Sequence, residues 1–154
     1  MLEIHNFTQN EIDEKLFQKA AEATLKILGI KDNVEISLAI VGNGRMRRLN
    51  KKYRRKNRVT DVLSFADKSV LPYLAKAFPR LKKGENFSSW PKLDKFIEPP
   101  DGVQRLGEII LCHPQAKKQS RRLNHPLEKE LAILLVHGIL HLAGVHHEKS
   151  GVAF

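Results

Sequence analysis

The sequence predicts one small α/β or α+β domain extending over residues 1–154. Its length and its 42% hydrophobic content are sufficient for a globular domain with its own core. Short segments rich in β-branched residues alternate with stretches at helical spacing, the pattern of domains that pack helices on a sheet. No internal repeat is visible. The single cysteine, Cys112, excludes an internal disulfide, and we expect it to be a small buried residue in a reducing cytoplasm.

The N-terminal part of the chain predicts a long helix. Thr8 and Glu11 have the spacing of a capping box, so we expect the helix to begin there and to end at Gly29. Apolar residues at helical spacing predict its inner face: Ile12, Leu16, Ala20, Ala23 and Ile27.

The middle of the chain predicts strands around a second helix. Residues 34–41 alternate and are rich in branched side chains, which indicates a strand. Asn43 is a candidate cap for the following helix. Residues 59–66 and 106–112 predict two further strands. The inner face of the second helix is predicted to consist of Met46, Leu49 and Tyr53.

Residues 67–105 form a proline-rich and aromatic-rich stretch between two predicted strands. We expect a short helix near residues 71–78 and otherwise loop. The favoured interpretation is a surface insertion closing over the core. The alternative is a flap that contacts nucleic acid, because aromatic side chains stack on bases.

The C-terminal part carries the most informative pattern. A helix is expected from Pro114 to about residue 123, and Asn124, Pro126 and Glu128 begin another. On that helix His137 and His141 are four residues apart, so both imidazoles can face one ion. Gly144 is a predicted helix stop, after which His147 can return to the same ion. Three nitrogens with one open position are typical of catalytic zinc sites, where zinc lowers the pKa of a bound water to about 7.

The same spacing matches a zinc-protease signature with one difference. Those proteases place a glutamate directly after the first histidine as general base. Gly138 occupies that position here, which argues against a metallopeptidase.

The charge pattern predicts a polyanionic partner. The formal net charge is +10, and residues 45–58 contain nine cations and no acid. Like charges at helical spacing repel, so an unmixed run indicates phosphate binding rather than a solvated face. The N-terminus lacks a signal-peptide pattern, and the longest apolar run is too short for a membrane span, so we expect no membrane partner. A second basic cluster consists of Lys117, Lys118, Arg121 and Arg122.

Three motifs in this order resemble the YbeY family of bacterial zinc-dependent endoribonucleases, which cleave single strands in ribosomal RNA maturation and ribosome quality control. Residues 49–65, LNKKYRRKNRVTDVLSF, are similar to the family's LN-x-x-YR-x-KD-x-PTDVLSF. Residues 106–109, LGEI, correspond to the family's LGDI motif. Residues 137–147, HGILHLAGVHH, correspond to its H-G-x-L-H-L-x-G-y-D-H motif.

The resemblance implies a mixed, roughly four-stranded sheet with the metal-site helix in the middle. It implies one zinc ion held by His137, His141 and His147, and Arg54 as the catalytic arginine. Thr60 and Ser64 would line the cleft, and the partners would be single-stranded ribosomal RNA and the small ribosomal subunit, with no nucleotide cofactor. The RNA-binding residues are expected to be Lys51, Lys52, Arg54, Arg55, Lys56 and Arg58.

Four positions depart from the family pattern. Asn57 replaces Asp, Val59 replaces Pro and Glu108 replaces Asp. His146 stands where the family has Asp, as a partner of the ligands, a proton shuttle or a competing ligand. His146 and His113 are the candidate general bases. These substitutions, and the short segment after His147, motivate the alternative of an RNA-binding assembly factor with a structural or vestigial zinc.

Overall fold

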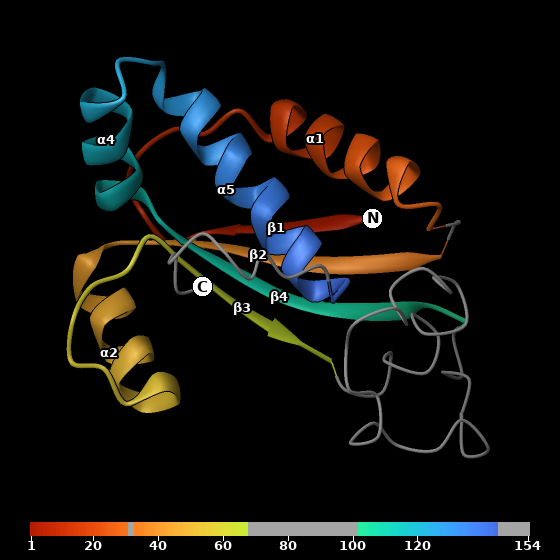
Figure 1. The fold of residues 1–154 in the computed structure, drawn as a ribbon, viewed down its shortest axis with the longest axis horizontal. Helices are drawn as coiled ribbons and strands as arrows, with labels where there is room; N and C mark the ends of the chain where they lie inside the picture. The colour runs from red at the N-terminus through yellow and green to blue at the C-terminus, as the bar shows by residue number, and fades with distance from the viewer. Residues whose placement is uncertain (31–32, 68–101, 145–154) are drawn as a thin grey trace.

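The computed structural model describes residues 1–30, 33–67 and 102–144, which form a small α+β fold with a four-stranded mixed sheet. This confirms the predicted fold class. None of the helices in the described ranges is long and apolar enough to cross a membrane. The elements, labelled as in Figure 1, are β1 (Leu2–Asn6), α1 (Glu14–Ile27), β2 (Val34–Val41), α2 (Asn43–Arg54), β3 (Val62–Ala66), β4 (Gln104–Cys112), α4 (His113–Arg122) and α5 (Leu127–Leu142).

The sheet has the strand order β1-β2-β4-β3. β1 pairs with β2 and β2 with β4 in parallel, whereas β3 pairs with β4 antiparallel. β3 is therefore an edge strand, and Ser64 in its centre lies opposite Ile109 of β4.

The two faces of the sheet carry different helices. Side chains alternate along each strand, so Leu38 of β2 joins the larger core with α1, α4 and α5, while Ala39 joins a smaller core with Met46 of α2. Figure 1 shows α1 and α5 side by side on one face and α2 apart from them. Helix α5, which carries His137 and His141, packs against α1, α4, β3 and β4, the central position implied by the resemblance.

A bulge in β4 shapes the sheet beneath the end of α5. Glu35 lies opposite Arg105 but Ile36 lies opposite Gly107, so one extra residue is inserted in β4. Gly107 has a φ of +142°, and a Cβ there would lie 2.1 Å from the Phe65 carbonyl oxygen. The glycine of the LGEI motif is thus required by the backbone of the neighbouring strand.

Gly138 lets α5 approach β4 closely. A Cβ at this position would lie 2.9 Å from Cγ2 of Ile109, which is fully buried. A residue larger than glycine would have to displace a branched core side chain. Position 138, where zinc proteases have the catalytic glutamate, therefore faces the sheet in this protein. The close approach to Ile109 explains why a side chain as large as glutamate is absent there.

The structure corrects the prediction for the first helix. α1 begins at Glu14 rather than near Thr8, because the Asp13 side chain accepts a hydrogen bond from the Leu16 N–H at 3.1 Å and caps the helix. The inner face is rotated from the predicted one: Ala23 and Ile27 are exposed. The buried residues are Phe17, Ala21 and Thr24.

The local structure differs from the sequence-based expectation at three further places. Strand β1 was not predicted from local pattern. Gly42, not Asn43, is the N-cap of α2, and the Asn43 side chain accepts a hydrogen bond from Gln115 Nε2 at 3.2 Å instead. The short helix near residues 71–78 lies outside the described residues, and Gln104 and Arg105, assigned to the insertion, belong to β4.

Candidate metal centre and basic surface

Two of the three predicted zinc ligands lie together on α5. His137 and His141 are one helical turn apart and both are half-buried. Gly144 has a φ of +83°, which confirms the predicted left-handed residue just past the helix end. The local geometry that the histidine spacing predicts is therefore present.

His141 is oriented by a serine of the edge strand. Ser64 Oγ lies 2.9 Å from His141 Nδ1, and Ser64 is 6% exposed. The tautomer with its proton on Nδ1 donates to the serine oxygen and keeps Nε2 as the metal-binding nitrogen. Metal-binding histidines commonly donate their second ring N–H to a neighbouring oxygen, so this contact is compatible with His141 as a metal ligand. Sequence reasoning placed Ser64 in the cleft but did not identify this contact.

Replacing Ser64 by alanine should weaken zinc binding about 10- to 100-fold, because the imidazole of His141 loses the partner that fixes its tautomer and orientation. A zinc titration against a competing chelator measures this loss. The matched control is Ser120→Ala, which removes another buried serine whose hydroxyl donates to the Lys117 carbonyl at 2.8 Å, on α4. Equal zinc affinities of both variants and the wild type would contradict the role of Ser64.

The third predicted ligand, His147, and the neighbouring His146 lie outside the described residues. Within residues 1–30, 33–67 and 102–144, no group of three histidine, cysteine, aspartate or glutamate side chains is close enough to hold a metal. The complete set of His137, His141 and His147 therefore stays a prediction.

His113 is poorly placed to act as a base beside His141. It is buried at the start of α4, where burial and then the charge of Lys117 lower its pKa below the usual range. His113 lies four residues beyond Ile109, which pairs with Ser64, and this separation is about 13 Å along the strand direction.

Cys112, the last residue of β4, is buried as predicted, and burial raises the pKa of its thiol.

The basic segment forms α2 and the loop that follows it. Eight of the nine cations in residues 45–58 are exposed, and Arg54 is half-buried. The buried Asn50 amide donates to the Arg58 carbonyl at 2.9 Å, and the Asn50 carbonyl accepts from the Lys56 N–H at 3.3 Å. Arg55 has a φ of +56° and ends the helix. The loop that presents the cations is therefore held by Asn50 of the LN motif. The eight exposed cations are Arg45, Arg47, Arg48, Lys51, Lys52, Arg55, Lys56 and Arg58.

The next motif residues anchor the edge strand. Asp61 Oδ2 accepts a hydrogen bond from Gln119 Nε2 of α4 at 2.9 Å, and the Asp61 carbonyl accepts from the Cys112 N–H at 2.8 Å. Thr60 Oγ1 donates to Asp61 Oδ1 at 3.4 Å, so this predicted cleft residue is half-buried beside the anchor.

Two positions that depart from the family pattern are accommodated. Asn57 Oδ1 accepts a hydrogen bond from Arg47 Nε at 2.9 Å. Val59 packs against the smaller core. The loop between α2 and β3 therefore keeps polar and apolar attachments with these residues.

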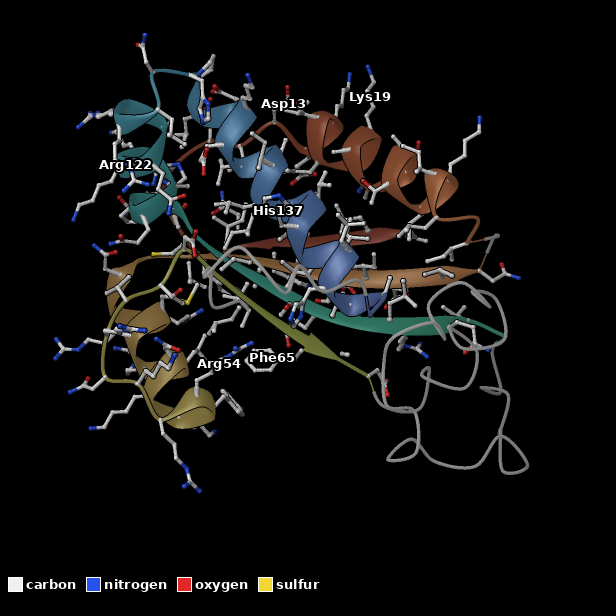
Figure 2. All side chains as sticks on the ribbon, in the orientation of Figure 1. Asp13, Lys19, Arg54, Phe65, Arg122 and His137 are labelled. Atoms are coloured by element: carbon white, nitrogen blue, oxygen red, sulfur yellow. The ribbon has the colours of Figure 1, made fainter. Side chains whose placement is uncertain are left out.

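Helix α2, which carries Arg54, and the histidines of α5 lie on opposite sides of the edge strand. Ser64 faces His141 on α5, whereas Phe65, the next residue, contacts the Tyr53 ring of α2 with 5.2 Å between ring centroids. Figure 2 labels Arg54 at the end of α2, Phe65 on β3 and His137 on α5. A ligand at the edge of β3 would thus have the candidate metal ligands on one side and the basic helix on the other.

The second basic cluster lies on α4, which contacts α2. All four of its cations are exposed. The cations of both helices therefore belong to neighbouring elements at one end of the sheet, although α2 and α4 cover opposite faces of it (Figure 1).

A family model described as Endoribonuclease YbeY matches residues 3–153. Endoribonuclease YbeY of Dehalococcoides mccartyi strain BAV1 is 36% identical over 143 residues, covering 92% of this chain and 80% of that protein. Endoribonuclease YbeY of Aquifex aeolicus is 35% identical over 143 residues, covering 93% of this chain and 75% of that protein.

The solution structure of TM1509 from Thermotoga maritima is similar to this fold. It superposes with a TM-score of 0.53 at 25% identity, covering 98% of this chain and 77% of that chain. The arrangement of strands and helices described above is therefore also found in an experimental structure.

Proposed function

The chain belongs to the Endoribonuclease YbeY family, and from this premise we propose that it is a zinc-dependent endoribonuclease that cleaves single-stranded RNA. One observation supports the proposal most directly. His141, one turn from His137, is oriented by Ser64 of the edge strand, across which lies the unmixed basic segment.

In this proposal His137, His141 and His147 hold the zinc ion. When bound, zinc supplies Lewis-acid stabilisation of the charge that develops on the phosphoryl oxygens. The Ser64 hydroxyl oxygen accepts a hydrogen bond from the N–H at His141 Nδ1 and thereby keeps the proton on that nitrogen. Arg54 binds the scissile phosphate, because its planar guanidinium can hold two phosphate oxygens at once. Exposed cations such as Lys51 and Lys52 hold the neighbouring phosphates.

Cleavage of a labelled single-stranded RNA by the purified chain tests this function. We expect cleavage that a chelator abolishes and added zinc restores. Mapping the product ends then separates attack by water from attack by the RNA 2′-hydroxyl, because only the second route gives a 2′,3′-cyclic phosphate. Tight, salt-sensitive RNA binding without metal-dependent turnover would contradict the enzyme assignment and support an RNA-binding assembly factor instead.

Replacing Arg54 by alanine should lower the turnover rate more than the RNA affinity. An arginine that stabilises charge in the transition state contributes roughly 10²- to 10³-fold to turnover. Single-turnover cleavage at saturating RNA, together with anisotropy titrations in chelator, measures the two quantities separately.

The control for Arg54 is Lys51→Ala, on the same helix. Loss of a simple phosphate contact should weaken RNA binding and reduce the slope of log affinity against log salt by about 1, with little change in turnover at saturation. Identical behaviour of the two variants would contradict a catalytic role for Arg54.

We further propose that the substrate is ribosomal RNA, met on the small ribosomal subunit in the cytoplasm. The net charge of +10 and the exposed cations of α2 and α4 support an extended RNA partner. Cleavage of a ribosomal RNA precursor at defined positions, compared with an unrelated single strand of equal length, tests the preference. Equal and unspecific cutting of both would contradict it.

Gly138 argues against a metallopeptidase. A glutamate at this position would have to enter the space of Ile109 rather than reach a metal ion. Chelator-sensitive peptide cleavage that persists in the presence of competing RNA would revive that activity.

A further inference from the structure

A groove on the α2 face of the sheet is not used by the proposed metal site. Its volume is about 520 Å³, within the range of roughly 300–1,000 Å³ that is common for ligand clefts. One wall is a single stripe of α2, formed by Arg45, Leu49 and Tyr53 at four-residue spacing. Phe7, just beyond β1, lines it as well.

The floor of the groove is the sheet face opposite α5. Ala39 of β2, Ile110 of β4 and Phe65 of β3 face it. Glu108 is the acidic residue among the described lining residues. The groove therefore ends at the edge strand, where Phe65 follows directly after Ser64.

Two aromatic rings of the groove are unusually exposed. Phe7 is 58% exposed and Tyr53 is 55% exposed. Each has a cation beside it: the Arg45 guanidinium lies 4.5 Å from the Phe7 centroid, and Lys52 Nζ lies 5.2 Å from the Tyr53 centroid. Exposed rings paired with cations suit a ligand that carries flat apolar groups and negative charges in alternation.

We propose that this groove binds single-stranded RNA, with bases stacking on Phe7 and Tyr53 and phosphates contacting Arg45 and Lys52. Single-stranded RNA combines unpaired bases with regularly spaced phosphates, and proteins hold it without sequence preference through aromatic and basic side chains. The eight exposed cations of residues 45–58 make the surroundings of the groove strongly positive. The net charge around the groove therefore favours a polyanion, even though Glu108 is among the lining residues.

The position of the groove relates it to cleavage. Its Tyr53 end adjoins Arg54 and Phe65, and Ser64 on the other side of the same strand contacts His141. A strand held in the groove would pass over the edge of β3 toward the histidines. The inference rests on the proposed function, since it assigns the site that holds the substrate beside the scissile phosphate.

The test compares the affinities of two proteins, the wild type and Phe7→Ala/Tyr53→Ala, for two RNA probes. Chelator is present throughout to prevent cleavage. The probes are a fluorescein-labelled adenosine 12-mer and an abasic RNA backbone of the same length, and anisotropy gives both affinities. Wild type should prefer the base-containing probe by about 10-fold or more, since stacking contributes about 5- to 150-fold per base. The double variant Phe7→Ala/Tyr53→Ala should lose this preference and keep its affinity for the abasic probe.

Two further proteins control for general effects. Ile27→Ala/Leu123→Ala removes two other exposed apolar side chains, 84% and 55% exposed, and should keep the preference. Tyr53→Phe should keep it as well, because the ring remains. Thermal midpoints establish that each variant is folded.

An equal affinity of wild type for both probes, or a preserved preference in the double variant, would overturn the groove assignment while leaving cleavage untouched. Concentration-dependent self-association that disappears in the double variant would assign the groove to a second copy of the chain instead. If the wild type shows no metal-dependent cleavage of RNA, the proposed function is contradicted, whatever the probe preference is.

Discussion

Replacing His141 by alanine should abolish zinc binding and lower RNA cleavage by about 10³-fold or more. Lewis-acid stabilisation by a metal is worth several kcal/mol, and each 1.4 kcal/mol is a factor of ten in rate. His141 is a proposed ligand, and Ser64 Oγ, 2.9 Å from its Nδ1, orients its imidazole. Zinc content after dialysis and single-turnover cleavage of a labelled single strand measure the two losses.

The fold should survive this substitution, because His141 is half-buried and its hydrogen bond to Ser64 is not part of either apolar core. His5→Ala is the control, since it removes a histidine of β1 whose side chain is 47% exposed, far from α5 in sequence. This control should retain its zinc. A His141→Ala protein with full zinc occupancy would contradict the ligand assignment, even if cleavage were lost.

Helix α5, with its two histidines, could be predicted from sequence because its signals are local. The histidine spacing, the apolar residues before it and Gly144 all act within one helix and its end. The structure confirms the helix as α5 and Gly144 as left-handed. The basic segment is predictable for the same reason, because its charges are consecutive in sequence and remain exposed on α2 and the loop after it.

Strand β1 was not predicted although Leu2 and Ile4 alternate with Glu3 and His5, because the alternation covers only four residues and is weak evidence for a strand. Of its five residues only Leu2 is buried, and the strand is defined by its backbone pairing with β2. The start of α1 was misplaced for a related reason. Thr8 and Glu11 have the capping-box spacing, but the Thr8 N–H and hydroxyl both bond to the Asn6 side chain, and Asp13 provides the cap.

The contacts that orient the site are tertiary and have no local signal. Ser64 and His141 are 77 residues apart in sequence. Asp61 reaches Gln119 on α4, and Gly138 is fitted to Ile109 on β4. A sequence motif indicates that such residues matter, but the physical reason appears only when the strands and helices are packed together.

Replacing Gly107 by alanine should be the most damaging small substitution in the described sheet. The added Cβ would lie 2.1 Å from the Phe65 carbonyl oxygen and 3.0 Å from Ala66 Cα, both backbone atoms of the paired strand. The φ of +142° is strained for any residue with a side chain. Together, overpacking and backbone strain should lower the free energy of unfolding by about 3 kcal/mol or more. For a chain of this size that corresponds to a fall of at least roughly 6 °C in the thermal midpoint.

Gly29→Ala separates backbone strain from the clash. Gly29 also has a positive φ, +72°, but a Cβ there would meet no atom within 4 Å. It should therefore cost only about 1 kcal/mol, the penalty for the left-handed conformation alone. Urea denaturation of both variants gives the comparison. Because the Leu142 side chain also lies 3.0 Å from the Cβ position of Gly107, distortion there should reach the end of α5 and weaken zinc binding, whereas Gly29→Ala should leave it unchanged. Equal stabilities of the two variants would mean that β3 can move away from the bulge, and the close fit between the edge strand and β4 would then not be what fixes Ser64 beside His141.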